Sequence, residues 1–455
     1  MKIAVLLKYF RGELGPFDAA ALECALELGG DVTVLSMSPQ SVSPALEALT
    51  RLGAHAVLIT DPAYAGSDTQ ATSYVLAEAI RKISPDVIFA GRQSIDGDTS
   101  QVPPMLAERL GFDMVSGVME LNKNNIKTRS GKEAAFKEKT IYTFERIRAL
   151  RFPSIFSKKG EVEVWNNSSL SLDLKKCGTA GSPTRVVRSY ESSVGRRICS
   201  YSSAKELDAL IKAGISKKTD DTPLESVSKT DIIYYVGNIK DIAEKYATHA
   251  ISFDASGKRP EEISDELTKL SASVVLFESN EKYKELAARV AVITGAGLCA
   301  DCISFRRDGE TFIMTRPALG GNVTADIACN SKMSFATVRK SEGDSEKVIF
   351  AVGRGAAQYI DSIKALAKKY GASVAASRPM VDGGLMPYEL QVGLTGKTVS
   401  PSVYVAFGIS GAVQHTSAIS GAKTVIAINS DKDARIFDYS DYGIVEDIGN
   451  LFEEK

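Results

Sequence analysis

Short apolar runs alternate with amphipathic segments through the first third of the chain. Apolar runs of strand length occupy residues 3–7, 31–36, 56–59 and 86–90, and helical spacing occurs at residues 18–28, 44–52, 69–83 and 103–110. Strands separated by helices of roughly 10–15 residues predict a parallel sheet with crossover helices. Ligands of such sheets bind at the carboxyl ends of the strands.

The alternation changes once and then resumes in two further blocks. Residues 122–157 are rich in Lys, Arg, Thr and β-branched side chains and predict an antiparallel excursion, residues 178–184 have loop composition, and residues 204–213 have helical spacing. In the last block we predict strands at residues 348–352, 373–376, 402–407 and 424–429, and helices at 361–370 and 411–419. Two short internal matches, 53–59 with 247–253 and 106–109 with 286–289, favour two related domains. The predicted fold is α/β, with two related Rossmann-like parallel-sheet domains and a C-terminal α/β domain.

Composition excludes several classes of protein. The 455 residues carry a net charge of -1, which gives no electrostatic reason to expect nucleic acid or an anionic membrane as partner. No stretch approaches the roughly 18 apolar residues of an integral membrane segment, and the N-terminus lacks a signal-peptide pattern, so we expect a cytoplasmic protein. Cys299 and Cys302 have C-x-x-C spacing, but with three histidines and no second cysteine pair the sequence predicts no metal site.

Residues 403–415 are the strongest candidate for chemistry. An apolar strand leads into a Gly-Ile-Ser-Gly turn and then into a predicted helix. Free N–H groups and partial positive charge at a helix start favour an anion, and Ser410 and Gly411 place no bulky side chain in the way. Gln414 and His415 follow one turn later. Taken alone, the pattern fits an anion site and a serine cap followed by surface side chains equally well.

Four neighbouring segments, residues 376–384, 391–397, 427–431 and 441–447, make the pattern specific. Together with 403–415, in this order and spacing, they resemble the FAD-binding domain of the electron transfer flavoprotein α subunit. The resemblance implies FAD near the C-terminus. It places three residues in the catalytic position at the flavin ring: Arg378 beside the ring, Thr395 near the flavin N5, and His415 at the C2 carbonyl.

The resemblance also implies a wider set of FAD contacts in the same segments. They are Arg354, Ser377, Gln391, Val392, Gly393, Leu394, Gly396, Ser410, Gly411, Ala412, Val413, Gln414, Asn429 and Asp447. Leu394 departs from the usual glutamine of the family, so a polar group near the flavin is lost there. Arg378 is always charged and His415 can donate a proton or a hydrogen bond, and both properties favour negative charge on the ring.

A second segment, residues 87–102, runs from a predicted strand into a helix. From the residues alone, Asp98 or Thr99 is a helix cap as readily as a phosphate contact, since a carboxylate repels phosphate. The segment resembles the adenine-nucleotide loop of the β subunit of the same family, which binds AMP in the electron carriers and a second FAD in the electron-bifurcating members. The implied ligand is therefore AMP or a second FAD. The implied contacts are Leu7, Asp98, Thr99, Ser100, Gln101 and Val102.

The resemblance divides the chain into four parts. Residues 1–217 resemble the β subunit with its C-terminal arm, 218–229 form a linker, 230–346 resemble the N-terminal domain of the α subunit, and 347–455 resemble its FAD-binding domain. The 230–346 domain lacks the Asp-Gly-Asp loop and is expected to be empty. In the β subunit, a loop that docks acyl-CoA dehydrogenases follows the strand represented here by residues 151–156. No such loop follows, so we expect the usual docking mode to be absent.

The predicted function is that of a fused electron transfer flavoprotein. Its FAD would carry electrons from a flavin-dependent dehydrogenase or another redox protein to an acceptor, so the chain is a carrier rather than a stand-alone enzyme. One alternative is an electron-bifurcating flavoprotein that oxidises NADH at a second FAD. Another is a redox-silent nucleotide-binding sensor, against which the joint presence of Arg378, Thr395 and His415 argues. The sequence leaves open AMP against FAD, the donor and acceptor, the redox potentials and a homodimer.

Overall fold

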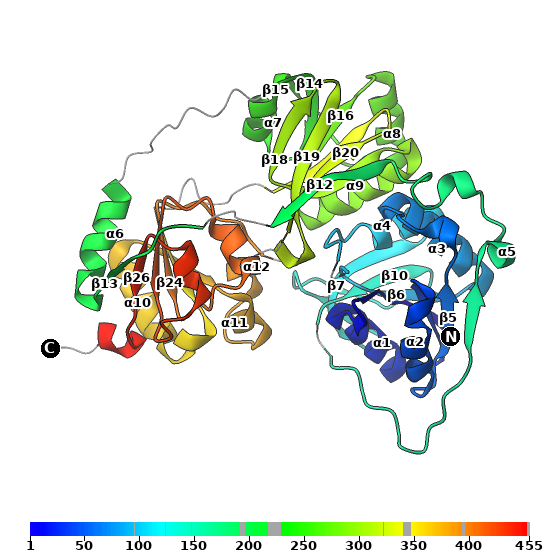
Figure 1. The fold of residues 1–455 in the computed structure, drawn as a ribbon, viewed down its shortest axis with the longest axis horizontal. Coiled ribbons are helices and arrows are strands. Elements are labelled where there is room, and N and C mark those ends of the chain that lie inside the picture. The colour runs from blue at the N-terminus through cyan, green and yellow to red at the C-terminus, as the bar shows by residue number, and fades with distance from the viewer. Residues whose placement is uncertain are drawn as a thin grey trace. The chain divides into compact units, whose positions relative to one another are not determined.

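A computed structural model describes residues 1–94, 96–122, 124–146, 148–191, 196–216, 229–321, 323–339, 347–393 and 396–452. The chain forms two compact units, drawn in Figure 1. The first contains residues 1–189, 227–319 and 325–338, and the second contains residues 190–226, 320–324 and 339–455. Both are built from parallel sheets with crossover helices, as the alternating pattern predicts.

The first unit contains a nine-stranded sheet. In spatial order its strands are β11 (Val162–Trp165), β5 (His55–Ile59), β4 (Asp31–Met37), β1 (Lys2–Leu6), β6 (Val87–Gly91), β10 (Thr140–Phe144), β7 (Asp113–Leu121), β8 (Ile126–Thr128) and β9 (Glu133–Ala134). The seven strands from β11 to β7 run parallel, and β7, β8 and β9 pair antiparallel. A two-stranded hairpin, β2 (Tyr9–Phe10) and β3 (Glu13–Leu14), follows β1.

Helices cover both faces of this sheet because its strands are apolar on both faces. Ile3 and Val5 of β1 pack in one cluster with α1 (Pro16–Leu28) and α2 (Ser43–Thr50). Ala4 and Leu6 pack in another with α3 (Thr69–Ile83) and α4 (Val102–Leu110). Every strand and helix predicted in the first third of the chain is therefore confirmed, to within a few residues.

Two predictions between residues 122 and 157 are wrong. Residues 140–144 do not belong to the antiparallel excursion: β10 lies inside the sheet, parallel to β6 and β7, because Ile141, Tyr142 and Phe144 are fully buried. Residues 151–156 do not form a strand but a loop between β10 and β11 (Figure 1), since Phe152, Ile155 and Phe156 have no apolar partner to pair against and stay exposed.

A second, five-stranded parallel sheet completes the first unit. Its order is β15 (Ala247–Ser252), β14 (Thr230–Val236), β16 (Val274–Glu278), β21 (Ser334–Val338) and β17 (Gly297–Cys302). Helices α8 (Pro260–Lys269) and α9 (Glu281–Thr294) pack on one face and α7 (Lys240–Tyr246) on the other. A further sheet, in the order β12, β20, β19 and β18, comprises β12 (Thr184–Glu191), β20 (Val323–Cys329), β19 (Thr311–Ala318) and β18 (Ser304–Asp308). The short helix α5 (Asn167–Leu170) follows β11.

The nine-stranded and five-stranded sheets of this unit contact each other through two helices in corresponding positions, α4 and α9. α4 follows β6, α9 follows β16, and the two helices pack against each other, with Met105 of α4 buried in the core around α9. The internal match 106–109 with 286–289 falls on these two helices. The match 53–59 with 247–253 is not structural: β4 separates β5 from β1, whereas β15 pairs directly with β14.

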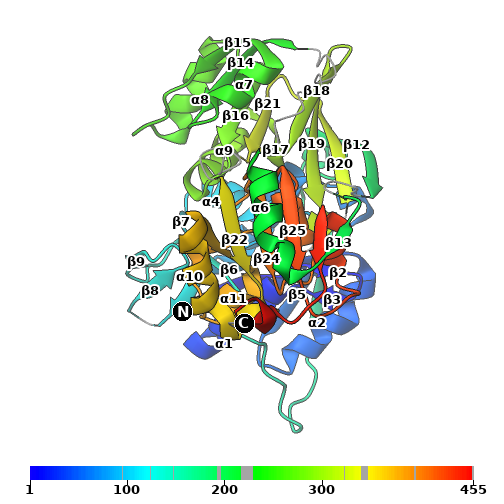
Figure 2. The same cartoon turned by 90° about the vertical axis from the view of Figure 1, so that its left-hand side faces the viewer.

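The second unit is a six-stranded parallel sheet with both faces covered. Its order is β13 (Ser200–Ser202), β26 (Tyr442–Ile444), β25 (Thr424–Ile428), β24 (Val403–Phe407), β22 (Val348–Val352) and β23 (Ser373–Ala376). Helices α6 (Leu207–Ser216) and α10 (Ile360–Tyr370) lie over one face (Figure 2), and 3-10 segments at Ser417–Ile419 and Arg435–Tyr439 pack on the other.

Residues 196–216 supply β13 and α6 to this second unit. In the predicted division of the chain the same residues are an arm of the β-like domain, 1–217, and these domain boundaries remain a prediction. The predicted linker, apart from Lys229, lies outside the described residues. The strands and the helix predicted at 361–370 are confirmed, but the helix predicted at 411–419 is shorter: α12 runs from Val413 to Thr416 and continues as the 3-10 segment Ser417–Ile419.

Candidate cofactor sites

Glycines allow backbone segments to pack closely at the carboxyl edge of the six-stranded sheet. Gly353 donates its N–H to the Phe407 carbonyl at 2.7 Å, and a Cβ at Gly353 would lie 2.3 Å from the Gly408 carbonyl oxygen. Gly408 itself has a φ of +60°, a conformation that favours glycine. The chain passes from β22 to β23 on one side and then to β24 on the other, and open α/β sheets bind ligands at such a reversal.

The turn between β24 and α12 also packs closely against another backbone segment through a glycine. A Cβ at Gly411, whose φ is +84°, would lie 2.1 Å from the Ile436 backbone nitrogen. Asn429 donates its side-chain N–H to the Ile409 carbonyl at 3.0 Å, so this side chain braces the turn. Ser410, Ala412 and Gln414 are exposed on the turn, and Val413 begins α12. Because α12 has one turn only, an anion would be bound by the turn before it rather than by the start of a helix.

A second segment, of which residues 391–393 and 396–397 are described, lies against α12 at Gly393. Val392 donates its N–H to the Ala376 carbonyl at 2.9 Å, and Lys397 donates to the Gln391 carbonyl at 2.7 Å. A Cβ at Gly396 would meet that same carbonyl at 2.2 Å, and one at Gly393 would lie 3.3 Å from the Gln414 carbonyl. The structure thus brings Gly393 to Gln414 and Val392 to His415. Leu394 and Thr395, two of the predicted flavin contacts, lie outside the described residues.

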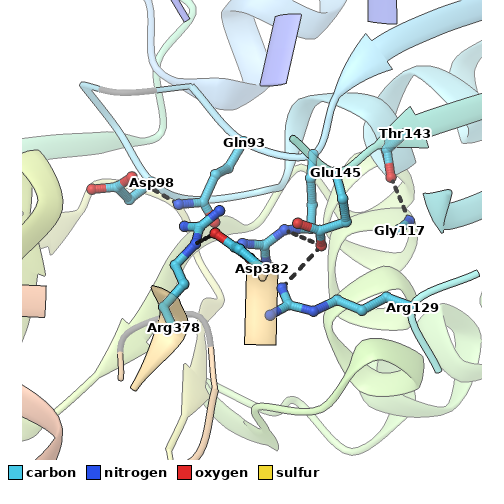
Figure 3. A network of polar contacts seen from close by, with 9 residues as sticks. Gln93, Asp98, Gly117, Arg129, Thr143, Glu145, Arg378 and Asp382 are labelled. Atoms are coloured by element: carbon cyan, nitrogen blue, oxygen red, sulfur yellow. Dashed lines mark hydrogen bonds and ion pairs between the residues drawn. The ribbon is translucent and has the colours of Figure 1, made fainter. Parts of the chain in front are cut away.

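Two buried polar atoms at this edge make no hydrogen bond with any described residue: Ser377 Oγ and His415 Nδ1. Buried polar atoms are almost always paired in folded proteins, so these two fit a polar ligand. Arg378, the first residue of α11 (Arg378–Asp382), donates Nε–H to the Asp382 carboxylate at 3.1 Å (Figure 3). Small residues, unpartnered donors and a fixed cation are the chemistry that FAD requires, so the residues present fit FAD.

Arg354 and Asp447 are the two outermost of the predicted FAD contacts, and their surroundings differ. Arg354 is exposed and follows β22 after Gly353. Asp447 accepts hydrogen bonds from the Gly449 N–H at 2.7 Å and from the Tyr359 hydroxyl at 3.1 Å, so its carboxylate caps the last 3-10 turn.

His415 packs back onto β24 and is held there by Tyr404. The Tyr404 hydroxyl lies 2.8 Å from His415 Nε2, and both side chains are buried. Burial lowers the pKa of His415 to about 4, opposed by the backbone at Val392. Burial also raises the pKa of Tyr404 well above its ordinary value. Both groups are therefore neutral at physiological pH, and His415 acts through hydrogen bonds rather than through charge.

The loop between β6 and α4 has an unusual backbone. Asp98 and Ser100 have φ values of +50° and +55°, a left-handed region that few residues other than glycine occupy. The Asp98 carboxylate accepts a hydrogen bond from the Gln93 amide at 2.9 Å (Figure 3), and the Thr99 hydroxyl accepts from the Gln101 N–H at 3.4 Å. Leu7 lies buried at the neighbouring end of β1.

Gln101 is buried and joins the two sheets of the first unit. Its Oε1 accepts from the Thr69 hydroxyl at 2.9 Å and its Nε2 donates to the Leu298 carbonyl at 3.3 Å. The Gln101 side chain is thus engaged within the protein, and Val102 is the first residue of α4.

Sequence reasoning missed Arg92, which follows β6 directly. Arg92 Nε lies 2.9 Å from a Glu145 oxygen. Arg129 Nη1 lies 3.1 Å from the same oxygen (Figure 3), so two cations share one buried carboxylate. Arg92 Nη2 is buried and makes no hydrogen bond with any described residue. The signal that could have identified Arg92 is its place directly after a strand, at the carboxyl edge of the sheet.

The second sheet carries no comparable loop. Between β16 and α9 stand only Ser279 and Asn280, and Asn280 caps α9. The Asp301 carboxylate accepts from the Ser279 hydroxyl at 2.5 Å and lies 2.8 Å from Lys284 Nζ, so an internal ion pair fills the corresponding strand ends.

Within the described residues, no helix is long and apolar enough to cross a membrane, and no group of three His, Cys, Asp or Glu side chains could hold a metal ion. Fold and strand-end residues together are those of an α/β protein that holds a nucleotide-type cofactor at the carboxyl edge of a parallel sheet.

Comparison with known proteins identifies the family within this class. The family model of the electron transfer flavoprotein domain matches residues 5–148 and 256–375, and that of the electron transfer flavoprotein FAD-binding domain matches residues 344–420. Protein FixA of Azorhizobium caulinodans is 36% identical over 227 residues, which cover 44% of this chain and 81% of the relative. The electron transfer flavoprotein subunit alpha of Mycobacterium tuberculosis is 33% identical over 216 residues, 38% of this chain and 67% of the relative. The subunit beta of Clostridium acetobutylicum is 38% identical over 198 residues, 40% of this chain and 76% of the relative.

The chain therefore belongs to the electron transfer flavoprotein family, with β-like and α-like subunits fused in one polypeptide and an FAD-binding domain near its C-terminus.

Proposed function

We propose that the protein accepts electrons from a flavin-dependent dehydrogenase and passes them to a second redox protein through FAD held at the carboxyl edge of the six-stranded sheet. The observation that carries the proposal is a pair of buried polar atoms, Ser377 Oγ and His415 Nδ1, which have no hydrogen-bond partner among the described residues and lie beside the glycine turns at the carboxyl edge of the sheet. When bound, FAD supplies the one-electron chemistry.

The residues of the chain divide the remaining work. The turns at 391–396 and 408–412 bring backbone and small side chains to the cofactor, and Ser377, Ser410 and Asn429 offer polar groups along it. Arg378 supplies a fixed positive charge that favours negative charge on the flavin, and His415 supplies a neutral hydrogen bond. Thr395 remains assigned to the flavin N5 by the family resemblance.

For the N-terminal half we propose an adenine nucleotide at the 91–102 loop, either AMP or the adenine end of a second FAD. In support, the loop holds two residues with positive φ and adjoins Arg92, whose Nη2 needs an acceptor. A second FAD would favour the alternative function, an electron-bifurcating oxidation of NADH. Cytoplasmic location and a homodimer remain predictions.

Cofactor content tests the function. The purified full chain is denatured, and FAD and AMP are quantified per chain, before and after incubation with FAD. We expect one FAD with one AMP for a simple carrier, whereas two FAD favour bifurcation and make NADH oxidation the next assay. No bound FAD after incubation would overturn the proposal and leave the redox-silent nucleotide sensor in its place.

An Arg92→Gln variant tests the nucleotide proposal for the first unit. It should lose the nucleotide of the N-terminal half and keep the FAD of the second unit, because Arg92 belongs to the first unit. Arg51→Gln, a change of the same kind at an arginine that binds the backbone of Ser154 and Ser157, is the matched control and should keep both ligands.

A further inference from the structure

Tyr404 places a buried hydroxyl group on β24. Neither the packing of the sheet nor the proposed cofactor contacts explain why this position carries a hydroxyl. It is fully buried in the apolar layer between the sheet and the 3-10 segments, and its hydrogen-bond partner there is His415 Nε2, 2.8 Å away. A phenylalanine would fill the same space without placing a polar group in that layer. The hydroxyl therefore needs a reason connected with His415.

Counting protons fixes the direction of this hydrogen bond. If the Tyr404 O–H donates to Nε2, the imidazole proton sits on Nδ1, and one buried donor, Nδ1–H, still needs a partner. If Nε2–H donates to the Tyr404 oxygen, the phenol proton and the Nδ1 lone pair are both left without partners, since Nδ1 has no described partner at ordinary hydrogen-bond geometry. The Val392 backbone beside the imidazole opposes the lowering of the His415 pKa, so it too favours a proton rather than a lone pair on the ring nitrogen that Tyr404 does not contact. The first arrangement leaves fewer buried groups unpaired and is the one that folding favours.

We propose that Tyr404 is a positioning residue for the flavin: its hydroxyl donates to His415 Nε2, fixes the neutral imidazole in the Nδ1–H form, and so presents Nδ1–H as a donor to a carbonyl oxygen of the cofactor. The hydrogen bond made by one ring nitrogen sets which nitrogen carries the proton. The proposal rests on the proposed function, because the acceptor it assigns belongs to the FAD bound there.

The proposal separates two roles at the flavin that sequence reasoning left together. Charge comes from Arg378, whose Nε–H is anchored on Asp382, and direction comes from the Tyr404–His415 pair. A neutral donor of fixed orientation favours a carbonyl oxygen at one place, whereas a charge acts over a wider region. His415 then holds its proton throughout and does not transfer it.

The direct test is the protonation state of His415 in the full chain labelled with 15N-histidine. His55 and His249 are exposed, and the His415 resonances are identified as those missing from His415→Asn. Without FAD, we expect a neutral imidazole with the proton on Nδ1, and in Tyr404→Phe the proton moves to Nε2 or exchanges between both nitrogens. Tyr370→Phe removes another hydroxyl bond of the same unit, to Asp208 at 2.7 Å, and should leave His415 unchanged.

Cofactor binding supplies the second measurement. Tyr404→Phe should weaken FAD binding about tenfold, the equivalent of one ordinary hydrogen bond, and should shift the flavin reduction potential. His415→Asn, whose amide N–H stands nearest to the Nδ1 position, should bind FAD more tightly than His415→Gln. Adding Tyr404→Phe to His415→Asn should then have no further effect.

The outcomes distinguish the inference from the function. An Nε2–H imidazole or an imidazolium at neutral pH in the natural chain, or an unchanged proton position in Tyr404→Phe, overturns the inference even if FAD binds. If Tyr404→Phe does not fold, the natural chain and the Asn–Gln comparison still decide. Failure to bind FAD overturns the proposed function, while the proton position of His415 without FAD still tests the Tyr404 hydrogen bond.

Discussion

Burial shifts the pKa of a titratable side chain near the strand ends in each unit, His415 in the second and Asp18 in the first. His415 is described above. Asp18 lies in the first turn of α1, accepts the Lys8 N–H at 2.8 Å and is 5% exposed. Burial raises the pKa of Asp18 to about 7, against the lowering effect of the Lys8 and Gly91 backbone. A carboxyl group that joins the ends of β1 and β6 is thus poised to titrate near neutral pH.

The stability of the first unit should therefore depend on pH through Asp18. The folded protein keeps a proton that the unfolded chain releases near pH 4, so the contribution of Asp18 is fully present below pH 4 and is lost as the pH rises through about 7. Asp18→Asn removes this dependence. In urea unfolding, the difference between natural and variant stability should fall by up to about 1.4 kcal/mol per pH unit between pH 4 and 7.

Asp265→Asn, at an exposed carboxylate on α8, is the matched control and should show no such slope. A difference between the natural chain and Asp18→Asn that stays constant from pH 4 to 8 would contradict the assignment of a raised pKa to Asp18.

At the scale of elements, α6 approaches the six-stranded sheet through a glycine. A Cβ at Gly214 would lie 2.6 Å from Val403 Cγ2 and 3.2 Å from Thr424 Oγ1. Val403 is fully buried in the central strand β24 and its β-branched side chain has little freedom to move. The glycine therefore lets the helix of the β-like arm pack against the core of the FAD-binding domain.

Gly214→Ala should destabilise the second unit even though alanine favours helices. The gain in helix propensity is about 1 kcal/mol, whereas overpacking a rigid core costs about 1–3 kcal/mol. We expect a net loss of about 1 kcal/mol, seen as a lower temperature of FAD release in thermal unfolding. Gly160→Ala, whose Cβ would lie at an ordinary 3.4 Å from Thr50, should be nearly neutral. A variant Gly214→Ala of raised stability would show that α6 does not pack as described.

The loop between β10 and β11 presents an exposed apolar surface. Phe152, Ile155 and Phe156 are 96%, 84% and 86% exposed, on a loop that projects from the nine-stranded sheet (Figures 1 and 2). Arg51 fixes its backbone by donating to the Ser154 and Ser157 carbonyls at 3.0 and 3.1 Å. The expectation that a docking loop is missing depended on a strand at 151–156, and without that strand the segment itself offers a surface for a partner.

Phe152→Ser with Phe156→Ser should weaken electron transfer to or from the partner protein. We expect KM for the partner to rise about tenfold or more, because two exposed aromatic anchors are lost, while FAD content and potential stay unchanged. Ile198→Ser changes another side chain that is 94% exposed, outside this loop, and should leave KM unchanged. An unaltered KM in the double variant would place the docking surface elsewhere.

The sequence predicted the regular elements well because their apolar periodicity is local, as in α3, where the predicted and observed bounds coincide. It failed where a partner strand or a short helix decides the outcome. The parallel pairing of β10 depends on its neighbours in the sheet, β6 and β7, which its own sequence does not reveal. The helix α12 is shortened by the turn at Gly411. At the site, the polar residues could be carried over from the family. The Tyr404–His415 pair could not, because Tyr404 looks like any apolar strand residue until its hydroxyl has a neighbour.

At the scale of the whole molecule, the fused halves are interleaved within each unit. In the first unit β12 of the β-like half stands beside β20 of the α-like half, and α4 packs on α9. In the second unit β13 pairs with β26, and Arg197 forms an ion pair with Asp441. Each half therefore contributes strands or helices that pack with those of the other half. We expect the covalent link to promote the assembly of the two halves more than it holds the assembled halves together.

Cutting the chain once between residues 217 and 229 tests this view. A protease site inserted there would separate a β-like fragment with its arm from an α-like fragment. We expect the two fragments to remain together in size-exclusion chromatography at micromolar concentration and to keep FAD, because both the arm contacts and the α4–α9 contact persist. Refolding from denaturant should by contrast become concentration-dependent, since the link no longer supplies a high effective concentration. In a matched control, weakening the arm with Gly214→Ala should let the cut fragments separate at higher protein concentration than the cut natural chain. Fragments that part at once under native conditions would show that the link itself, rather than the shared sheets, holds the halves together.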